Sequence, residues 1–240
     1  MTAIVLALLL AQDPRCTGDA VKLVPSAAQR ATLFDLAGAA RLLQAATRAG
    51  CPGAEVASAY VRGLLAAREA YRFGGSPESL APVFESITLL KSASRGTNDR
   101  AAIAAFVLQA AAAAAQSERD ELSLMIEHAV QLEGVLMSAN EPGLPMVTAH
   151  EVAGDLWLQV HRYDDARRAY ERARSRLGMT LRVTLGVARV ASRLDATSTA
   201  CRQYQQLVTL WKEQETDPPE ISEARTFLSG PACKGASNAK

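Results

Sequence analysis

Aromatic residues are scarce in this sequence: Phe, Trp and Tyr together make up 5% of its 240 residues. Sheet proteins favour aromatic and β-branched residues in their strands, so this scarcity argues against a β-sandwich core. No stretch alternates apolar and polar residues as a half-buried strand would. Alanine, in contrast, is plentiful, and it suits close packing of helix on helix. The sequence therefore predicts an all-α fold.

Basic and acidic residues are nearly equal in number, and the formal net charge is +1. This balance requires neither a general polyanion such as nucleic acid nor a strongly basic ligand. Hydrophobic residues make up 49% and charged residues 21%, which is typical of a globular chain and not of a disordered one. A chain of this length can bury a substantial core in one or two domains.

Motifs that would indicate catalysis or a bound metal are also missing from the sequence. There is no phosphate-binding P-loop, no G-x-G-x-x-G and no G-x-S-x-G. His150-Glu151 begins an H-E-x-x-H pattern, but Gly154 stands where the second histidine would be. The cysteines form no C-x-x-C pair, so a zinc site has no support. We therefore predict no metal and no cofactor.

No apolar run is long enough to cross a bilayer. The alanine-rich run 101–115 is too short, contains Gln109 and is only weakly apolar. We expect this run to form a helix that is buried on several sides, and we predict no integral membrane span.

Residues 1–11 have several features of a signal peptide. Thr2 to Ala11 form a short apolar run, and polar residues 12–14 follow it. No Lys or Arg precedes the run, and the alternative is an N-terminal helix packed on the fold. We expect the protein to be exported to a periplasm or the extracellular space; if the run is not a signal, the protein is cytoplasmic.

The four cysteines fall as two pairs, one near each end of the chain. Four cysteines allow three pairings, and the local pairing would tie each chain end to the adjacent helices. We predict that Cys16 pairs with Cys51 and Cys201 with Cys233. Four reduced thiols are the alternative, and they would be expected in the cytosol.

Helical periodicity and its breaks divide the chain into segments. A polar segment, 12–25, leads into an irregular helical-repeat region, 26–140, whose first helix starts at Ser26 and ends at Cys51-Pro52-Gly53. Region 147–230 has a sharper pattern and ends in a short helix. Residues 231–240 are predicted to be a polar tail.

Part of this pattern repeats with a displacement of 34 residues. Three helix positions recur: Ala166 and Ala200, Tyr170 and Tyr204, Ala173 and Leu207. With a small residue at Gly154 and an aromatic one at Trp157, the sequence resembles the tetratricopeptide repeat (TPR) family. The match is clear over about 147–212 and weaker over about 54–134. The resemblance implies antiparallel helix pairs stacked as a right-handed α-solenoid with a C-terminal capping helix.

Arginine is concentrated in one part of this region. Between Arg162 and Arg193 the sequence has nine arginines against three carboxylates. The resemblance implies that the first helix of each pair lines a concave groove. It places six residues on that groove: Glu151, Asp155 and Gln159 on one helix and Arg182, Arg189 and Arg193 on the next.

We expect the groove to bind a peptide or protein segment whose acidic part lies over the arginines, since arginine binds carboxylates bidentately. The alternative is that these arginines pair internally with Glu151, Asp155 or the negative end of a neighbouring helix. Few aromatics are available to stack on bases, so no nucleic acid is expected. The predicted function is an exported adaptor or scaffold. A helical enzyme whose site is assembled from residues distant in sequence is the alternative, and a pocket with convergent titratable groups would favour it.

Overall fold

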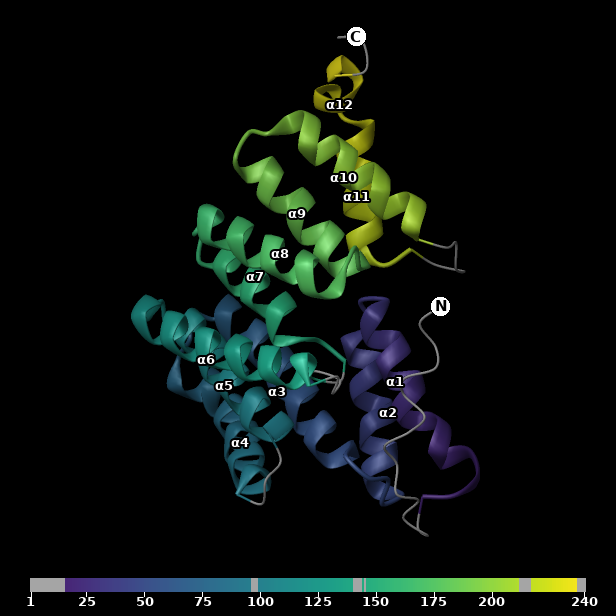
Figure 1. The fold of residues 1–240 in the computed structure, drawn as a ribbon, viewed down its shortest axis with the longest axis vertical. Coiled ribbons are helices and arrows are strands. Elements are labelled where there is room, and N and C mark those ends of the chain that lie inside the picture. The colour runs from purple at the N-terminus through teal and green to yellow at the C-terminus, as the bar shows by residue number, and fades with distance from the viewer. Residues whose placement is uncertain (1–15, 96–98, 140–143, 145, 212–216, 237–240) are drawn as a thin grey trace. The chain divides into compact units, whose positions relative to one another are not determined.

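The computed structural model is built from helices throughout the part of the chain that it describes (Figure 1). It describes residues 16–95, 99–139, 144, 146–211 and 217–236, and these ranges contain no strand. The all-α prediction is confirmed for them, while the predicted signal segment 1–11 lies outside the described residues. The chain divides into two compact units, residues 1–149 and residues 150–240.

The first unit is a series of helices in which each packs against the next. It comprises the 3-10 turn η2 (Gly18–Lys22), α1 (Leu23–Thr32), α2 (Leu36–Arg48), α3 (Ala54–Arg72), α4 (Pro77–Ser94), α5 (Asp99–Ala115) and α6 (Arg119–Ser138). In addition to these sequential contacts, α3 packs against α5. The predicted polar segment 12–25 thus includes η2 and the first residues of α1.

The prediction of one helix from Ser26 to Cys51 is wrong, because the chain turns between α1 and α2. Phe34 adopts a left-handed backbone conformation with φ 67°. Asp35 then caps α2: its carboxylate accepts the Gly38 N–H at 2.7 Å and the Arg30 guanidinium at 2.6 Å. An aspartate at this position satisfies a free N–H of the first helical turn, which favours a new helix start.

Small residues let the helices of the first unit approach closely. α5 is buried on nearly all sides, as expected for run 101–115. A Cβ placed on Gly63 of α3 would lie 2.2 Å from Leu108 Cδ1 of α5, so the two helices meet where α3 has no side chain. Among the described helices, none is both long and apolar enough to cross a membrane.

The second unit is also a series of packed helices. It comprises α7 (Ala149–Gln159), α8 (Tyr163–Leu177), α9 (Leu181–Arg193), α10 (Thr197–Leu210), α11 (Pro219–Ser229) and α12 (Pro231–Ala236). From α8 onward each helix packs against the next, and α12 also packs against α10. α9 and α10 run antiparallel (Figure 1). The predicted polar tail 231–240 therefore contains a helix.

Both predicted disulfides are present in the structure. Cys16–Cys51 joins the start of the described chain to the turn between α2 and α3, with a Cα–Cα distance of 4.7 Å. Cys201–Cys233 joins α10 to α12 at 5.7 Å. Both distances are normal for a disulfide. Each bridge fixes a short element at one end of the described chain, and the Cys16–Cys51 bridge lies in a small apolar cluster with Ala46 and Ala54.

Replacing Cys201 and Cys233 together by serine should lower the free energy of unfolding by roughly 3–4 kcal/mol. The reason is that a bridge across 32 residues removes conformational entropy from the unfolded chain. Denaturant unfolding of the oxidised protein measures this change. Reducing the wild-type protein should cost at least as much, because it opens both bridges. An unchanged unfolding midpoint in the double variant would contradict the prediction.

Candidate partner-binding site

The six residues predicted to line a groove lie on two helices of the second unit, three on α7 and three on α9. The structure brings Asp155 and Arg182 together, with 2.9 Å between Oδ2 and Nη2. Arg189 pairs instead with Glu223 of α11. Arg193 is exposed and makes no ion pair with any residue that the structure describes. Glu151 is buried, and Gln159 is half-buried.

Tyr170 of α8 sets the spacing of α7 and α9. A Cβ placed on Gly154 would lie 2.5 Å from the Tyr170 ring, and one on Gly186 would lie 2.1 Å from it. Both helices therefore present a bare backbone to the ring, which is 1% exposed. The Tyr170 hydroxyl donates to Asp155 Oδ1 at 2.6 Å. Gly154 and Tyr170 were identified from the sequence, whereas Gly186 was not.

The carboxylate held by Tyr170 in turn neutralises a buried arginine. The Arg182 side chain is 9% exposed, and burial alone would disfavour its charge. The charges of Asp155 and Glu151 outweigh this effect and raise the pKa of Arg182. Burial, followed by the charge of Asp155, raises the pKa of Tyr170 well above its usual value, so its hydroxyl keeps the proton that it donates.

Thr180 connects Glu151 to the start of α9. Its hydroxyl donates to Glu151 Oε1 at 2.9 Å and accepts the Val183 N–H at 3.1 Å. It is therefore the N-cap of α9, a position that threonine favours. Arg182 Nε has no hydrogen-bond partner among the described residues.

A second set of contacts joins α9, α10 and α11. Arg189 Nε donates to Glu223 Oε1 at 3.0 Å, and its Nη2 donates to Oε2 at 2.5 Å. This is a bidentate pair, the strongest geometry for arginine and carboxylate. The Tyr204 hydroxyl donates to Glu223 Oε1 at 2.7 Å. The centroid of the Tyr204 ring lies 4.7 Å from that of the Phe227 ring.

These contacts follow the 34-residue displacement. Asp155, Arg189 and Glu223 succeed one another at this interval, and so do Tyr170 and Tyr204. The charge at the equivalent position thus alternates from negative to positive to negative on α7, α9 and α11. We call Asp155, Arg182, Arg189 and Glu223 the charge ladder. Sequence reasoning missed Glu223, although extending the displacement once more from Arg189 identifies it.

The charge ladder changes what the predicted groove residues can offer a partner. Arg182 pairs with Asp155, which is the internal alternative considered for these arginines, and Arg189 is already bound to Glu223. Binding of a partner by these residues stays a prediction. One turn further along these helices, equivalent positions hold Gln159, Arg193 and Phe227, and of these three Arg193 is exposed.

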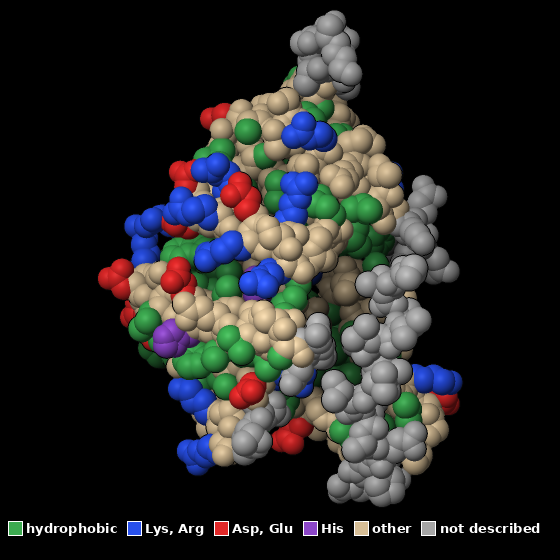
Figure 2. Space-filling model, viewed as in Figure 1, with side chains coloured by type: hydrophobic (Ala, Val, Ile, Leu, Met, Phe, Trp, Pro, Cys, Tyr) green, Lys and Arg blue, Asp and Glu red, His purple; other side chains and the backbone are tan. Residues whose placement is uncertain are grey.

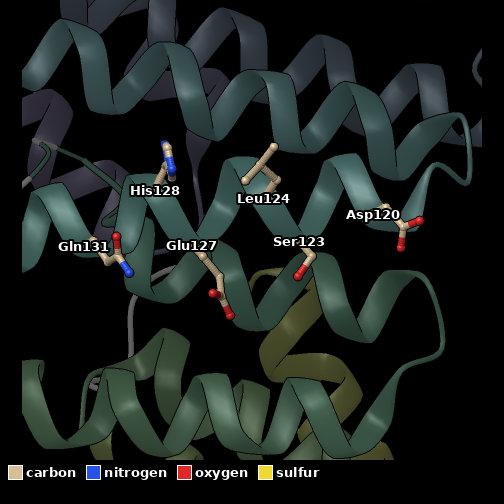
Figure 3. A pocket seen from close by; sticks show the side chains of 6 residues that line it. All are labelled: Asp120, Ser123, Leu124, Glu127, His128 and Gln131. Carbon is tan, nitrogen blue, oxygen red and sulfur yellow. The ribbon is translucent and has the colours of Figure 1, made fainter.

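The described residues also line an open hollow of about 430 Å³ on α6. Its lining residues all come from this one helix and are shown in Figure 3: Asp120, Ser123, Leu124, Glu127, His128 and Gln131. The His128 ring packs edge-on against Phe106 of α5, with 5.5 Å between ring centroids. Within the described ranges, no group of three or more His, Cys, Asp and Glu side chains is placed to hold a metal ion.

Comparisons with known proteins add no evidence on the function of this chain. The chain matches no protein-family model, no curated protein and no solved structure. The resemblance to the TPR family therefore stays a prediction that depends on the repeated positions in 147–212.

Gly186→Ala should lower the free energy of unfolding by about 1–3 kcal/mol, because the added methyl group overlaps the buried Tyr170 ring. Thermal unfolding followed by circular dichroism measures the effect. Gly134→Ala is a matched control, since a Cβ at Gly134 of α6 meets nothing within 4 Å. This control should stabilise by about 0.5–1 kcal/mol, as alanine does in a helix interior. A Gly186→Ala protein as stable as the wild type would contradict the close packing around Tyr170.

Glu223→Gln should remove part of the acid sensitivity of the fold. Burial disfavours the Glu223 carboxylate, but the bond and charge of Arg189 outweigh burial and lower the pKa of Glu223 below its usual 4.5. A carboxyl with a lowered pKa in the folded state stabilises the fold above the unfolded pKa, and this contribution is lost as pH falls.

The difference in melting temperature between wild type and Glu223→Gln should therefore be largest above about pH 5 and narrow below pH 4.5. Glu220→Gln on the same helix is the control, because Glu220 makes no ion pair with a described residue. A difference that does not depend on pH would contradict the role given to the Glu223 charge.

Proposed function

We propose that this protein is an exported, disulfide-tied helical-repeat adaptor or scaffold that binds a peptide or protein segment through its second unit. In this proposal the helix pairs stack as a TPR-like right-handed solenoid, and α7, α9 and α11 line its concave face. One observation carries the proposal: equivalent positions on these three helices hold Asp155, Arg189 and Glu223. Repeated helices that present equivalent residues form a continuous surface suited to an extended partner.

The ladder residues support this face but are not its free contacts. Arg182 is buried, and removing it would break its ion pair with the Asp155 carboxylate, which is costly in a protein interior. Arg193 and Phe227 would supply the contacts: an exposed cation without an ion pair to any described residue and a half-buried aromatic ring. A partner with a carboxylate opposite Arg193 and an apolar side chain near Phe227 fits this set.

Export is supported by the two disulfides, which persist in oxidising compartments and are rare in the cytosol. The apolar run Thr2 to Ala11 supports the same proposal from the sequence. An adaptor in a periplasm or the extracellular space would meet its partner there.

The partner face is tested with Arg193→Gln. Partners retained by the full-length oxidised protein in a non-reducing pull-down from its native source are identified, and their affinity is then measured directly. Loss of one accessible charge contact should weaken binding by about fivefold, more at low salt because exposed charges are screened by ions. Arg202→Gln, an exposed arginine of α10, carries the same charge change away from the face. Equal affinity for wild type and Arg193→Gln would overturn the assignment of this face, and failure to retain any partner would overturn the adaptor function.

A further inference from the structure

The exposed side of α8 is a dense arginine surface that the proposed binding face does not use. Five of its arginines are exposed: Arg167, Arg168, Arg172, Arg174 and Arg176. Figure 2 shows basic side chains gathered over α7 and α8 in this view. No lysine occurs between Lys91 and Lys212, so the positive charge of this surface is carried by guanidinium groups.

Carboxylates within the helix neutralise only part of this surface. Arg167 pairs with Asp164, and Arg168 pairs with Asp165. Arg172, Arg174 and Arg176 make no ion pair with a described residue. The negative end of the helix dipole favours cations in the last turn, where Arg174 and Arg176 lie, but it does not reach back to Arg172.

Three of these arginines form a regular row. Arg168, Arg172 and Arg176 occupy positions i, i+4 and i+8, and we call them the arginine stripe. An α-helix rises about 1.5 Å per residue, so successive members are offset by about 6 Å along the axis. Each guanidinium is planar and binds a carboxylate through two parallel hydrogen bonds. Arg172 and Arg176 therefore present bidentate donors at this repeat, while Arg168 already donates to Asp165 through Nη2.

We propose that the arginine stripe is a docking surface for an acidic helix of a partner protein, with carboxylates at i, i+4 and i+8. Such a helix repeats its carboxylates at the same offset of about 6 Å, so it can engage Arg172 and Arg176 together, and Arg168 when this residue exchanges its contact with Asp165. This surface lies on α8 and is separate from the face formed by α7, α9 and α11.

The side chains of α8 favour this partner over a membrane or a nucleic acid. A helix that lies in a membrane interface inserts an apolar face. The apolar face of α8 is already buried, through Ala166, Ala169, Tyr170 and Ala173. Binding of single-stranded nucleic acid depends on aromatic rings that stack on bases. Tyr170 is buried, and the hydroxyl of half-buried Tyr163 lies 3.0 Å from His161 Nδ1.

The test measures binding of a synthetic alanine-based helical peptide with glutamates at i, i+4 and i+8 to the full oxidised protein. A second peptide has the same composition, with its glutamates placed on different faces of the helix. The stripe variant is Arg168→Gln with Arg172→Gln and Arg176→Gln, in which Asp165 keeps its contact with Arg162. The matched control removes the same charge elsewhere: Arg167→Gln, Arg174→Gln and Arg202→Gln. Circular dichroism verifies that both variants remain folded.

We expect wild type to prefer the regular peptide over the scrambled one by at least fivefold. The stripe variant should lose about tenfold in affinity for the regular peptide and the control about twofold, with both affinities falling as salt rises. Equal losses in the two variants would show a response to net charge alone and would overturn the proposal. If a DNA oligonucleotide or phosphatidylserine vesicles bind the stripe more tightly than the regular peptide does, the proposal is overturned and the ligand is a phosphate group. Arg193→Gln should not change binding of the peptide. The proposal for the arginine stripe and the proposal for the face of α7, α9 and α11 can therefore fail separately.

Discussion

The position of one tyrosine ring governs the arrangement of charge in the second unit. Tyr170 fits between Gly154 and Gly186, and its hydroxyl holds the Asp155 carboxylate. That carboxylate neutralises Arg182, whose burial would otherwise be strongly unfavourable. The spacing of α7 and α9, the burial of the arginine and the direction of the carboxylate thus depend on each other. An apolar ring alone would set the helix spacing but would not donate the hydrogen bond to Asp155 Oδ1.

The arginines of this unit consequently divide into two groups. Arg182 and Arg189 are bound to carboxylates on neighbouring helices and contribute to the structure. Arg193 and the arginine surface of α8 face solvent, where charge serves association more readily than stability. A protein that fixes some charges internally and leaves others at regular positions presents a defined electrostatic pattern. Rigid helices keep that pattern in register, which reduces the entropy lost on binding.

Small residues allow close helix packing in the first unit, as Gly154 and Gly186 do in the second. Gly63 lets Leu108 of α5 lie directly on the α3 backbone, and the alanines of α5 let helices approach on several sides. Close contact supplies dispersion energy that large aromatic rings provide in other proteins. Two short elements near the ends of the described chain, η2 and α12, pack on neighbouring helices and each also lies near a disulfide. Packing and covalent links are therefore complementary along the chain.

The sequence by itself determined the all-α fold, because helical periodicity and its breaks are local signals. It predicted the local cysteine pairing from the position of the two pairs, with the other pairings and reduced thiols left open. It placed Tyr170 and Gly154 in one repeating pattern for the same reason, and the six residues predicted to line a groove were assigned from that pattern. It did not predict the turn at Phe34, where one aspartate cap outweighs a continuous apolar pattern. Only the tertiary structure decided that Arg182 pairs with Asp155 and Arg189 with Glu223. Ion pairing depends on distances between side chains of different helices, and these distances are set by how closely Tyr170 and its two glycines allow the helices to pack.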